Sequence, residues 1–543
     1  MKSTRILSLI PTFCTYSIIP QFTPPCSAYQ QLKPIRLGGY SKEHVNTCVT
    51  KTAENSRSLQ DRVPRSNPRQ LLKEPGTALR SSNFFSSMDW ASSPIRTGRD
   101  RCMGTRFATM STASTVGGLM THTSSSAGST SVNWPLWYVL PIAPYQKRKT
   151  IMKEIVPGKV WTFDQLQGIL YVIVPVRMTI IKLQNTPGGG LLVYAPVAPT
   201  GECMAKVRNL EAEHGPVRHI VLGTLGLEHK VFAGPFAQRF KEAQVWFTPG
   251  QYSFPVALPL SWLGFGGRPT NQIPASALDA PWSADLDHAV LGPFFSKDGS
   301  GGYGETAFFH KDTKTLLVTD LVVKVDDKVP DIVAQDPRPL LFHARDNALE
   351  RVDNTPEVRL KGWRRIVQFA LTFQPSGLEV VDLKQALFED APRSKMKELG
   401  WGGLFPFEWK DPRRDVKSFD AMKGGLLVAP ILQVLLLNRD PGPVLDWADR
   451  VARWPFRRVI PCHLANDVAA TPQEFRKAFR FLEKGGSGAM SRSLLTSLFG
   501  GGREGGGAQP LDEDLQFLRD AEKKLVELGT LFPAAEPIDR SYR

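Results

Sequence analysis

Four short stretches of the sequence place a polar side chain soon after a run of apolar residues. They read VLGTLGLEH at 221–229, VWFTPGQ at 245–251, TLLVTD at 315–320 and RRVIPCH at 457–463. Two imidazoles and two carboxylates among them are ligand types that hold zinc, iron or manganese, namely His229, His463, Glu228 and Asp320. If strand ends bring side chains of these types together, they could bind a metal ion.

A purely structural interpretation of the same residues is the alternative. His229 would then pack at a helix start, Asp320 would be an ordinary turn acid, and His463 would donate to a backbone carbonyl. Cys462, next to His463, is predicted to be a buried thiol, with a redox-sensitive neighbour of a site as the second interpretation. The residues therefore predict either one bound divalent metal or none.

Short strands and helices must position these side chains, and they alternate without the regular repeat of a βαβ protein. Runs rich in β-branched and aromatic residues predict one bent strand or two at 169–184 and a hairpin at 306–325 with a polar link at 311–314. They also predict strands at 191–197, 217–223, 243–250 and 457–463. Apolar spacing and stop residues predict helices at 201–214, 228–240, 442–455, 471–484 and 512–529. The stretch 424–438 is predicted to be a buried helix or a pair of strands. This order indicates an α+β domain in which helices cover sheets.

The order of the four stretches resembles that of the metallo-β-lactamase superfamily. There the first loop reads His-x-His-x-Asp-His, a Thr-Pro-Gly-His turn often follows, and two later strands end in Asp and in His. Over about residues 160–465 the matching places hold Thr224, Gly226, Glu228, His229, Gln251, Asp320 and His463, and Tyr194 stands where an upstream acid is usual. The resemblance implies an α+β fold of the four-layered αββα sandwich type.

A narrower resemblance rests on the segments QLQGILYVIVP, EHK, PGQYSFP and IPCH. Together they look like an uncharacterised domain-of-unknown-function family of plants, algae and cyanobacteria, which is grouped with the same fold.

The superfamily resemblance also implies which of two metal positions is kept. The first metal is held by the two leading histidines and the turn histidine, whose places are taken here by Thr224, Gly226 and Gln251. None of these offers an imidazole, so the first position is lost. The second position corresponds to Glu228, His229, Asp320 and His463. Glu228 is one methylene longer than the usual Asp, so it either binds the metal or supports an imidazole.

Residues 1–133 differ in composition from the rest of the chain. They are rich in Ser and Thr, show no sustained apolar period, and contain 16 Lys and Arg against 6 Asp and Glu. This is typical of a transit peptide, and the apolar stretch near the N-terminus favours a two-part plastid leader. A single long transit peptide and a merely disordered tail are the alternatives. We therefore expect a disordered targeting leader and a chloroplast or other plastid location.

The remaining chain is predicted to form one main domain with a C-terminal extension. Residues 134–484 form the metallo-β-lactamase-like domain, with a more polar insertion around 331–423. The Gly- and Ser-rich stretch 485–510 is predicted to be a flexible linker, and 511–543 a C-terminal helix and tail. Arg177 lies inside an apolar run, and we expect it to pair with a buried acid such as Asp320.

Charge and hydropathy exclude some partners. The net charge is +15, but residues 134–543 contain 51 Lys and Arg against 46 Asp and Glu, so no nucleic-acid partner is expected. No stretch reaches the roughly 20 apolar residues of a membrane span. Trp134 and Trp137, in a Pro-containing segment followed by basic residues, favour a strap over the core, with a peripheral membrane contact as the alternative. The six cysteines include no CxxC pair, which argues against a zinc ribbon.

Two functions are compatible with these features. Loss of the first metal position at three separate places favours a plastid binding or assembly protein without catalysis, whose partner is an unknown small molecule or plastid protein. The alternative is a mononuclear metallohydrolase acting on an ester, a thioester or a phosphoester, because one metal can ionise a water molecule. The fold alone does not choose between them.

Overall fold

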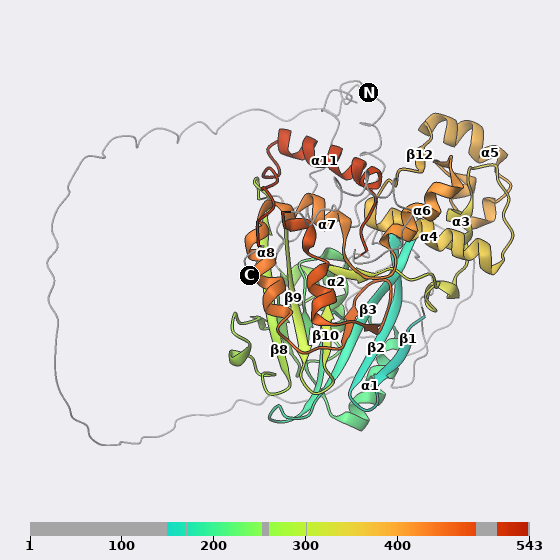
Figure 1. Ribbon diagram of the computed structural model, residues 1–543. Helices are drawn as coiled ribbons and strands as arrows, with labels where there is room; N and C mark the ends of the chain where they lie inside the picture. The colour runs from blue at the N-terminus through green and yellow to red at the C-terminus, as the bar shows by residue number, and fades with distance from the viewer. Residues whose placement is uncertain (1–148, 170, 252–259, 300, 485–507, 541–543) are drawn as a thin grey trace, which may run out of the picture. The chain divides into compact units, whose positions relative to one another are not determined.

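The computed structural model describes residues 149–169, 171–251, 260–299, 301–484 and 508–540 (Figure 1). These residues belong to one unit of the chain. The expected leader, Trp134, Trp137 and nearly all of the expected linker lie outside them.

Seven strands form the larger sheet, in chain order from β1 to β7. Neighbours from β1 to β4 run antiparallel, and neighbours from β4 to β7 run parallel. The Val- and Ile-rich run for which the sequence allowed one bent strand or two forms the long strand β3. The bounds are β1 Ile151–Val156, β2 Val160–Ile169, β3 Val172–Leu183, β4 Gly190–Tyr194, β5 Val217–Leu222, β6 Gln244–Phe247 and β7 Thr270–Gln272.

Five strands form the smaller sheet, in the order β16, β15, β10, β9, β8. Strand β10 pairs antiparallel with β9, which confirms the hairpin predicted around the polar link at 311–314. On its other side β10 pairs parallel with β15, so these two strands end side by side. The bounds are β8 Leu286–Phe295, β9 Gly302–His310, β10 Thr315–Val318, β15 Arg458–Pro461 and β16 Val468–Ala469.

Apolar side chains form three clusters around the two sheets. One draws on both sheets and lies between them, with Leu192 and Val221 from the larger sheet and Phe308 and Leu317 from the smaller. A second joins the larger sheet to the helices α1 (Gly201–His214) and α2 (Leu227–Ala237). The third joins the smaller sheet to α7 (Pro430–Leu435), α8 (Pro441–Val451), α9 (Pro472–Lys477) and α11 (Gln516–Glu527). Helices therefore bury the sheet faces, in a mixed α and β architecture.

The polar region at 331–423 is mainly helical (Figure 1). Its longest helix, α4 (Pro356–Thr372), crosses α3 (Arg338–Ala344) at Gly362, where a Cβ would lie 1.9 Å from the carbonyl oxygen of Leu340. Only glycine permits this approach of two helix backbones. The buried guanidinium of Arg365, on α4, forms ion pairs with Asp346 and Asp415. The other elements are β12 Leu378–Val380, α5 Ala391–Arg393, β13 Phe407–Trp409 and α6 Pro412–Met422.

The apolar stretch 424–438 is neither one helix nor a pair of strands. It forms the short strand β14 (Leu426–Val428), which pairs with β11 (Val322–Lys324), and then the helix α7. Pro430 explains the change, because proline is favoured in the first turn of a helix and restricts the residue before it to extended backbone.

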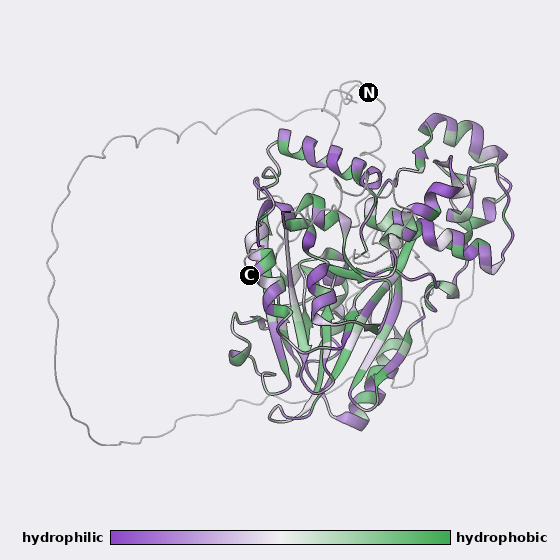
Figure 2. Cartoon of the chain, viewed as in Figure 1, coloured by the Kyte–Doolittle hydropathy of each residue, from purple (hydrophilic) through white to green (hydrophobic). Residues whose placement is uncertain are grey.

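The C-terminal helix predicted over 512–529 begins as a 3-10 turn at Asp512–Leu515 and continues as α11. Its residues Leu518, Ala521 and Leu525 are buried, and Figure 2 shows both apolar and polar residues along it. The helix predicted over 471–484 is shorter, since α9 ends at Lys477 and a 3-10 turn follows. Among the described residues, no helix is both long and apolar enough to cross a membrane.

Two buried histidines outside the predicted metal site should make stability depend on pH. Burial lowers the pKa of His219 and of His310 to about 4, so both rings are neutral in the folded protein. In the unfolded chain they titrate near 6.5, so the unfolded state takes up protons first as the pH falls. We expect the free energy of unfolding to decrease from about pH 6.5 to about pH 4, by about 3 kcal/mol per histidine at most.

Urea unfolding at several pH values measures this decrease. His310→Asn is a suitable comparison, because the Nδ1 atom of His310 is hydrogen-bonded to the Thr313 hydroxyl at 2.7 Å and an amide can replace that contact. The variant should show a shallower decrease between about pH 6.5 and pH 5, above the range in which most carboxylates titrate. An unchanged slope would contradict the role given to His310.

Candidate metal centre

Two of the four predicted ligands follow strand ends, and the other two lie at the start of a helix. Asp320 and His463 come two residues after β10 and β15, respectively. Because these strands are parallel neighbours in register, the two side chains emerge next to each other. Glu228 and His229 lie in the first turn of α2, which follows the loop after β5. The structure therefore brings all four side chains together, two that follow strands of the smaller sheet and two from the helix that follows β5 of the larger sheet.

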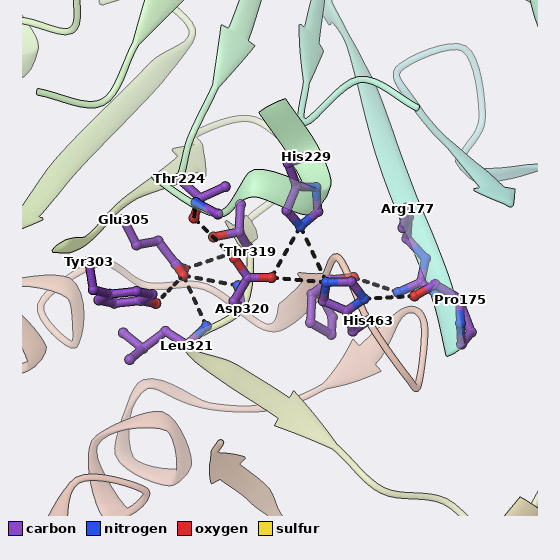
Figure 3. Close-up of polar contacts among 12 residues, drawn as sticks. Pro175, Arg177, Thr224, His229, Tyr303, Glu305, Thr319, Asp320, Leu321 and His463 are labelled. Carbon is purple, nitrogen blue, oxygen red and sulfur yellow. Dashed lines mark hydrogen bonds and ion pairs between the residues drawn. The ribbon is translucent and has the colours of Figure 1, made fainter. Parts of the chain in front are cut away.

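Three ligand atoms form a tight triangle in Figure 3. The Nε2 atom of His463 lies 2.9 Å from Oδ1 of Asp320, and the Nε2 atom of His229 lies 3.1 Å from the same oxygen. The two Nε2 atoms are 3.2 Å apart. With a carboxylate oxygen of Glu228 included, the ligand atoms all lie within 4.8 Å of one another. The side chain of His229 is fully buried, while those of Asp320 and His463 are 12% and 16% exposed.

The hydrogen bond at Nδ1 of His463 indicates which of its ring nitrogens can bind a cation. Its Nδ1 atom lies 2.8 Å from the carbonyl oxygen of Pro175, which can only accept a hydrogen bond. In the neutral ring the proton is therefore on Nδ1, and the Nε2 lone pair faces the carboxylate and the other imidazole. A carbonyl that fixes a histidine in this way is the usual support of a metal ligand. One cation would satisfy all three atoms, so the donor set fits a divalent metal.

The two histidines differ in their support. The Nδ1 atom of His229 is buried and has no hydrogen-bond partner among the described residues. Its ring is held instead by its place in α2 and by the Nε2 contacts to Asp320 and His463. The orientation of His463 is therefore set by the backbone, and that of His229 by packing.

Burial and charge act in opposite directions on the pKa values of the site. Burial raises the pKa of Asp320, but His229 and His463 outweigh this effect and hold it well below its usual range. Burial lowers the pKa of His229, and Asp320 and Glu228 reverse the shift, so the net change is upward. For Glu228, burial and the neighbouring Asp320 raise the pKa to about 6. Asp320 is thus an ionised carboxylate that faces two imidazoles.

The three residues expected to replace the ligands of a first metal form hydrogen bonds of their own. The hydroxyl of Thr224 donates to Oδ2 of Asp320 at 3.0 Å and accepts from the backbone N–H of Gly226. A Cβ at Gly226 would lie 3.0 Å from Oε1 of Glu228 and 3.2 Å from Oδ2 of Asp320. The side amide of Gln251 donates to the carbonyls of Thr224 and Thr248. The second oxygen of Asp320 is therefore engaged by a hydroxyl, and only Oδ1 faces the triangle.

Tyr194 and Cys462 lie near the site without joining it. The Tyr194 hydroxyl donates to the carbonyl oxygen of Thr306 at 2.9 Å. Cys462 is 2% exposed, and burial, with Asp320 nearby, raises the pKa of its thiol well above the usual range. It is thus a buried, protonated thiol, as preferred from the sequence, because reactive cysteines need an accessible thiolate.

Arg177 pairs with a buried acid, as predicted, but the acid is Asp164 and not Asp320. Its Nε donates to Asp164 at 2.6 Å, because β2 and β3 pair in a register that places Asp164 directly opposite Arg177. The other guanidinium nitrogens donate to the carbonyl oxygens of Pro461, at the end of β15, and of Leu464 and Ala465, in the loop after His463. Arg177 therefore acts on the site through the backbone beside His463.

Sequence reasoning missed Glu305. This residue is fully buried on β9, and its carboxylate accepts hydrogen bonds from the backbone around Asp320. Burial and Asp320 raise its pKa, and the hydrogen bonds from Thr319 and Leu321 oppose the shift. The available signal was a single acid in the otherwise uncharged run GYGETAFF at 302–309, which a strand buried on both faces rarely contains.

A comparison with protein families gives a match to a family model described as a domain of unknown function, DUF4336, over residues 157–481. The chain belongs to this family. The matched DUF4336 range includes all four predicted ligands, as well as Arg177 and Glu305. No curated protein matches the chain in sequence.

Solved structures similar to the DUF4336 protein include flavodiiron proteins and metallo-β-lactamases. A metal-soaked flavodiiron core from Synechocystis sp. PCC6803 is 10% identical, with 64% of this chain and 63% of that chain covered and a TM-score of 0.31. A metallo-β-lactamase from Pontibacter korlensis is 14% identical, with 41% and 86% covered and a TM-score of 0.24. A flavoprotein from Thermotoga maritima is 8% identical, with 62% and 61% covered and a TM-score of 0.31. The chain thus spans less than two thirds of these two flavoproteins.

Proposed function

We propose that this DUF4336 protein is a mononuclear metalloprotein with a four-layered sandwich of the metallo-β-lactamase type. His229, His463 and Asp320 would hold one divalent ion, with Glu228 as a fourth ligand or as a support for an imidazole. The observation that carries the proposal is the triangle of Nε2, Nε2 and Oδ1 atoms, in which the Pro175 carbonyl turns the lone pair of His463 inward.

The reaction class that suits such a centre is hydrolysis of an ester, a thioester or a phosphoester. A zinc, iron or manganese ion held there would supply a Lewis acid and would lower the pKa of a bound water molecule to about 7. The chain contributes an ionised Asp320 and the Thr224 hydroxyl, which keeps Oδ2 of that carboxylate turned away from the two imidazoles. Because Oδ2 is engaged, we propose one ion per chain rather than two.

A second candidate is a binding or assembly protein without catalysis. It is favoured by the three replaced places, since Thr224, Gly226 and Gln251 form hydrogen bonds with one another and with Asp320 and so fill the first metal position. The partner would be a small molecule or a plastid protein. The plastid location remains a proposal that rests on the composition of residues 1–133.

Elemental analysis of the purified protein tests the metal proposal directly. We expect about one transition metal ion per chain without added metal, because four ligand-capable side chains converge on one point. Restoring the ion to chelator-treated protein should also raise its thermal unfolding temperature, since a ligand of the folded state stabilises it. A metal-free protein whose unfolding temperature does not respond to zinc, iron or manganese would rule out the metal centre.

A further inference from the structure

Glu305 lies beneath the candidate metal centre and contacts none of its ligand atoms directly. It belongs to β9, which lies between β8 and β10 in the smaller sheet, and is completely buried. Its Oε1 atom accepts from the backbone N–H of Thr319 at 2.8 Å. Its Oε2 atom accepts from the N–H groups of Asp320 and Leu321 at 3.0 and 2.9 Å, and from the Tyr303 hydroxyl at 2.9 Å.

These contacts fix the backbone that carries Asp320. Three consecutive N–H groups can meet one carboxylate only if the chain from 319 to 321 curves around it, as in other anion-binding turns. The curve determines where the Asp320 side chain leaves the backbone, and Figure 3 shows it leaving toward His229 and His463. A buried carboxylate with four donors is a strong anchor, because hydrogen bonds to charged groups are about twice as strong as neutral ones.

The same part of β9 also holds the loop that leads to His229. Glu305 forms an isolated bridge with Thr224, the N–H of Thr306 donates to the carbonyl of Gly223 at 2.7 Å, and the N–H of Leu225 donates to the carbonyl of Gly304 at 3.0 Å. Backbone hydrogen bonds therefore connect residues 304–306 to the loop before α2, which leads to His229. The Glu305 side chain connects the same residues to the loop that carries Asp320.

We propose that Glu305 is a positioning residue that sets the metal affinity of this site, by holding the Asp320 loop in register with the loop before α2. The inference rests on the proposed metal centre and adds to it a residue outside the ligand set. A carboxylate is required because the side amide of glutamine has one accepting oxygen and would present its NH₂ group to one of the backbone donors.

The chain provides a matched control in Asp285. This carboxylate is 2% exposed and accepts from the backbone N–H groups of Gln184, Asn185 and Thr186 and from the Thr186 hydroxyl. It thus makes the same kind of anchor, but for the loop after β3, at the opposite end of that strand from Pro175. Asp285→Asn should cost stability as Glu305→Gln does, without acting on a ligand-bearing loop.

The test compares the full chain with Glu305→Gln and Asp285→Asn. For each chelator-treated protein, Zn²⁺ affinity is measured by competition with a chromophoric chelator, Co²⁺ is used as a spectroscopic probe, and thermal unfolding is followed without metal. Both variants should unfold at a lower temperature. Only Glu305→Gln should weaken Zn²⁺ binding, by about 10- to 100-fold, and change the Co²⁺ absorption.

Each outcome decides the inference. An unchanged Zn²⁺ affinity in Glu305→Gln overturns the inference but not the proposed metal centre. Equal losses of Zn²⁺ affinity in Glu305→Gln and Asp285→Asn also overturn it, because a general loss of stability would then explain both. A failure of the unaltered chain to bind either ion overturns the metal centre, and the inference with it. If Glu305→Gln does not fold, Tyr303→Phe removes one of the four donors and keeps the carboxylate. It should weaken Zn²⁺ binding in the same direction but less, and unchanged affinity would again overturn the inference.

Discussion

A protein in which His229 and His463 are both replaced by alanine should contain no bound transition metal, against about one ion per chain in the unaltered protein. The two Nε2 atoms are two of the three atoms of the central triangle, so the change leaves only carboxylate ligands. Two carboxylates alone are a poor site for a zinc-like ion in water. Elemental analysis after extensive dialysis measures the loss, and circular dichroism shows whether the variant is folded.

The control for this variant is His310→Asn, which changes a buried histidine that belongs to a different strand end. It should retain the full metal content. If the double variant kept its ion, the ligands would have to lie elsewhere, and the proposed centre would be wrong.

The same double variant separates the two candidate functions. A hydrolase should lose its turnover together with its metal while the fold is preserved. A binding or assembly protein should support the same growth and the same complexes in cells whether or not the ion is present. This comparison is informative because neither the fold nor the ligand set identifies a substrate.

Much of the site's placement was predictable from the sequence because strand ends are local features. Apolar runs predicted strands that end at Asp320 and at His463, and in the structure β10 and β15 end two residues before them. The start of α2 at LEHK was predictable for the same reason. The contact between these ends depends on β10 and β15 being parallel neighbours, and it was inferred from the superfamily resemblance, since no local pattern encodes it.

The buried charges could not be predicted in the same way. The partner of Arg177 is decided by the register of β2 against β3, which places Asp164 opposite Arg177. A shift of one residue in this register would have placed Asp164 on the other face of the sheet. Glu305 acts on residues 319–321 across the β9–β10 pair, through side-chain contacts to backbone N–H groups. No local pattern shows which part of the backbone such a carboxylate will contact, because every residue other than proline offers the same N–H donor.

Arg177→Met should destabilise the metal-free protein by about 3 to 5 kcal/mol, because removing one member of a buried ion pair leaves the other without compensation. Asp164 would lose its guanidinium partner, and the carbonyls of Pro461, Leu464 and Ala465 would lose their donor. Urea unfolding in the presence of a chelator measures this cost without any contribution from bound metal. A loss below about 1 kcal/mol, as for a typical surface ion pair, would contradict the role of Arg177.

The double variant Arg177→Met, Asp164→Leu distinguishes the two roles of the guanidinium. Replacing both members of the pair with apolar side chains removes the uncompensated carboxylate, so a large part of the stability should return. The three carbonyls would still have no donor, and the loop that carries His463 would still be released from β3. We therefore expect the double variant to bind Zn²⁺ more weakly than the unaltered protein, as Arg177→Met does, although its free energy of unfolding recovers. Recovery of both quantities together would show that Arg177 stabilises the fold alone and does not position His463.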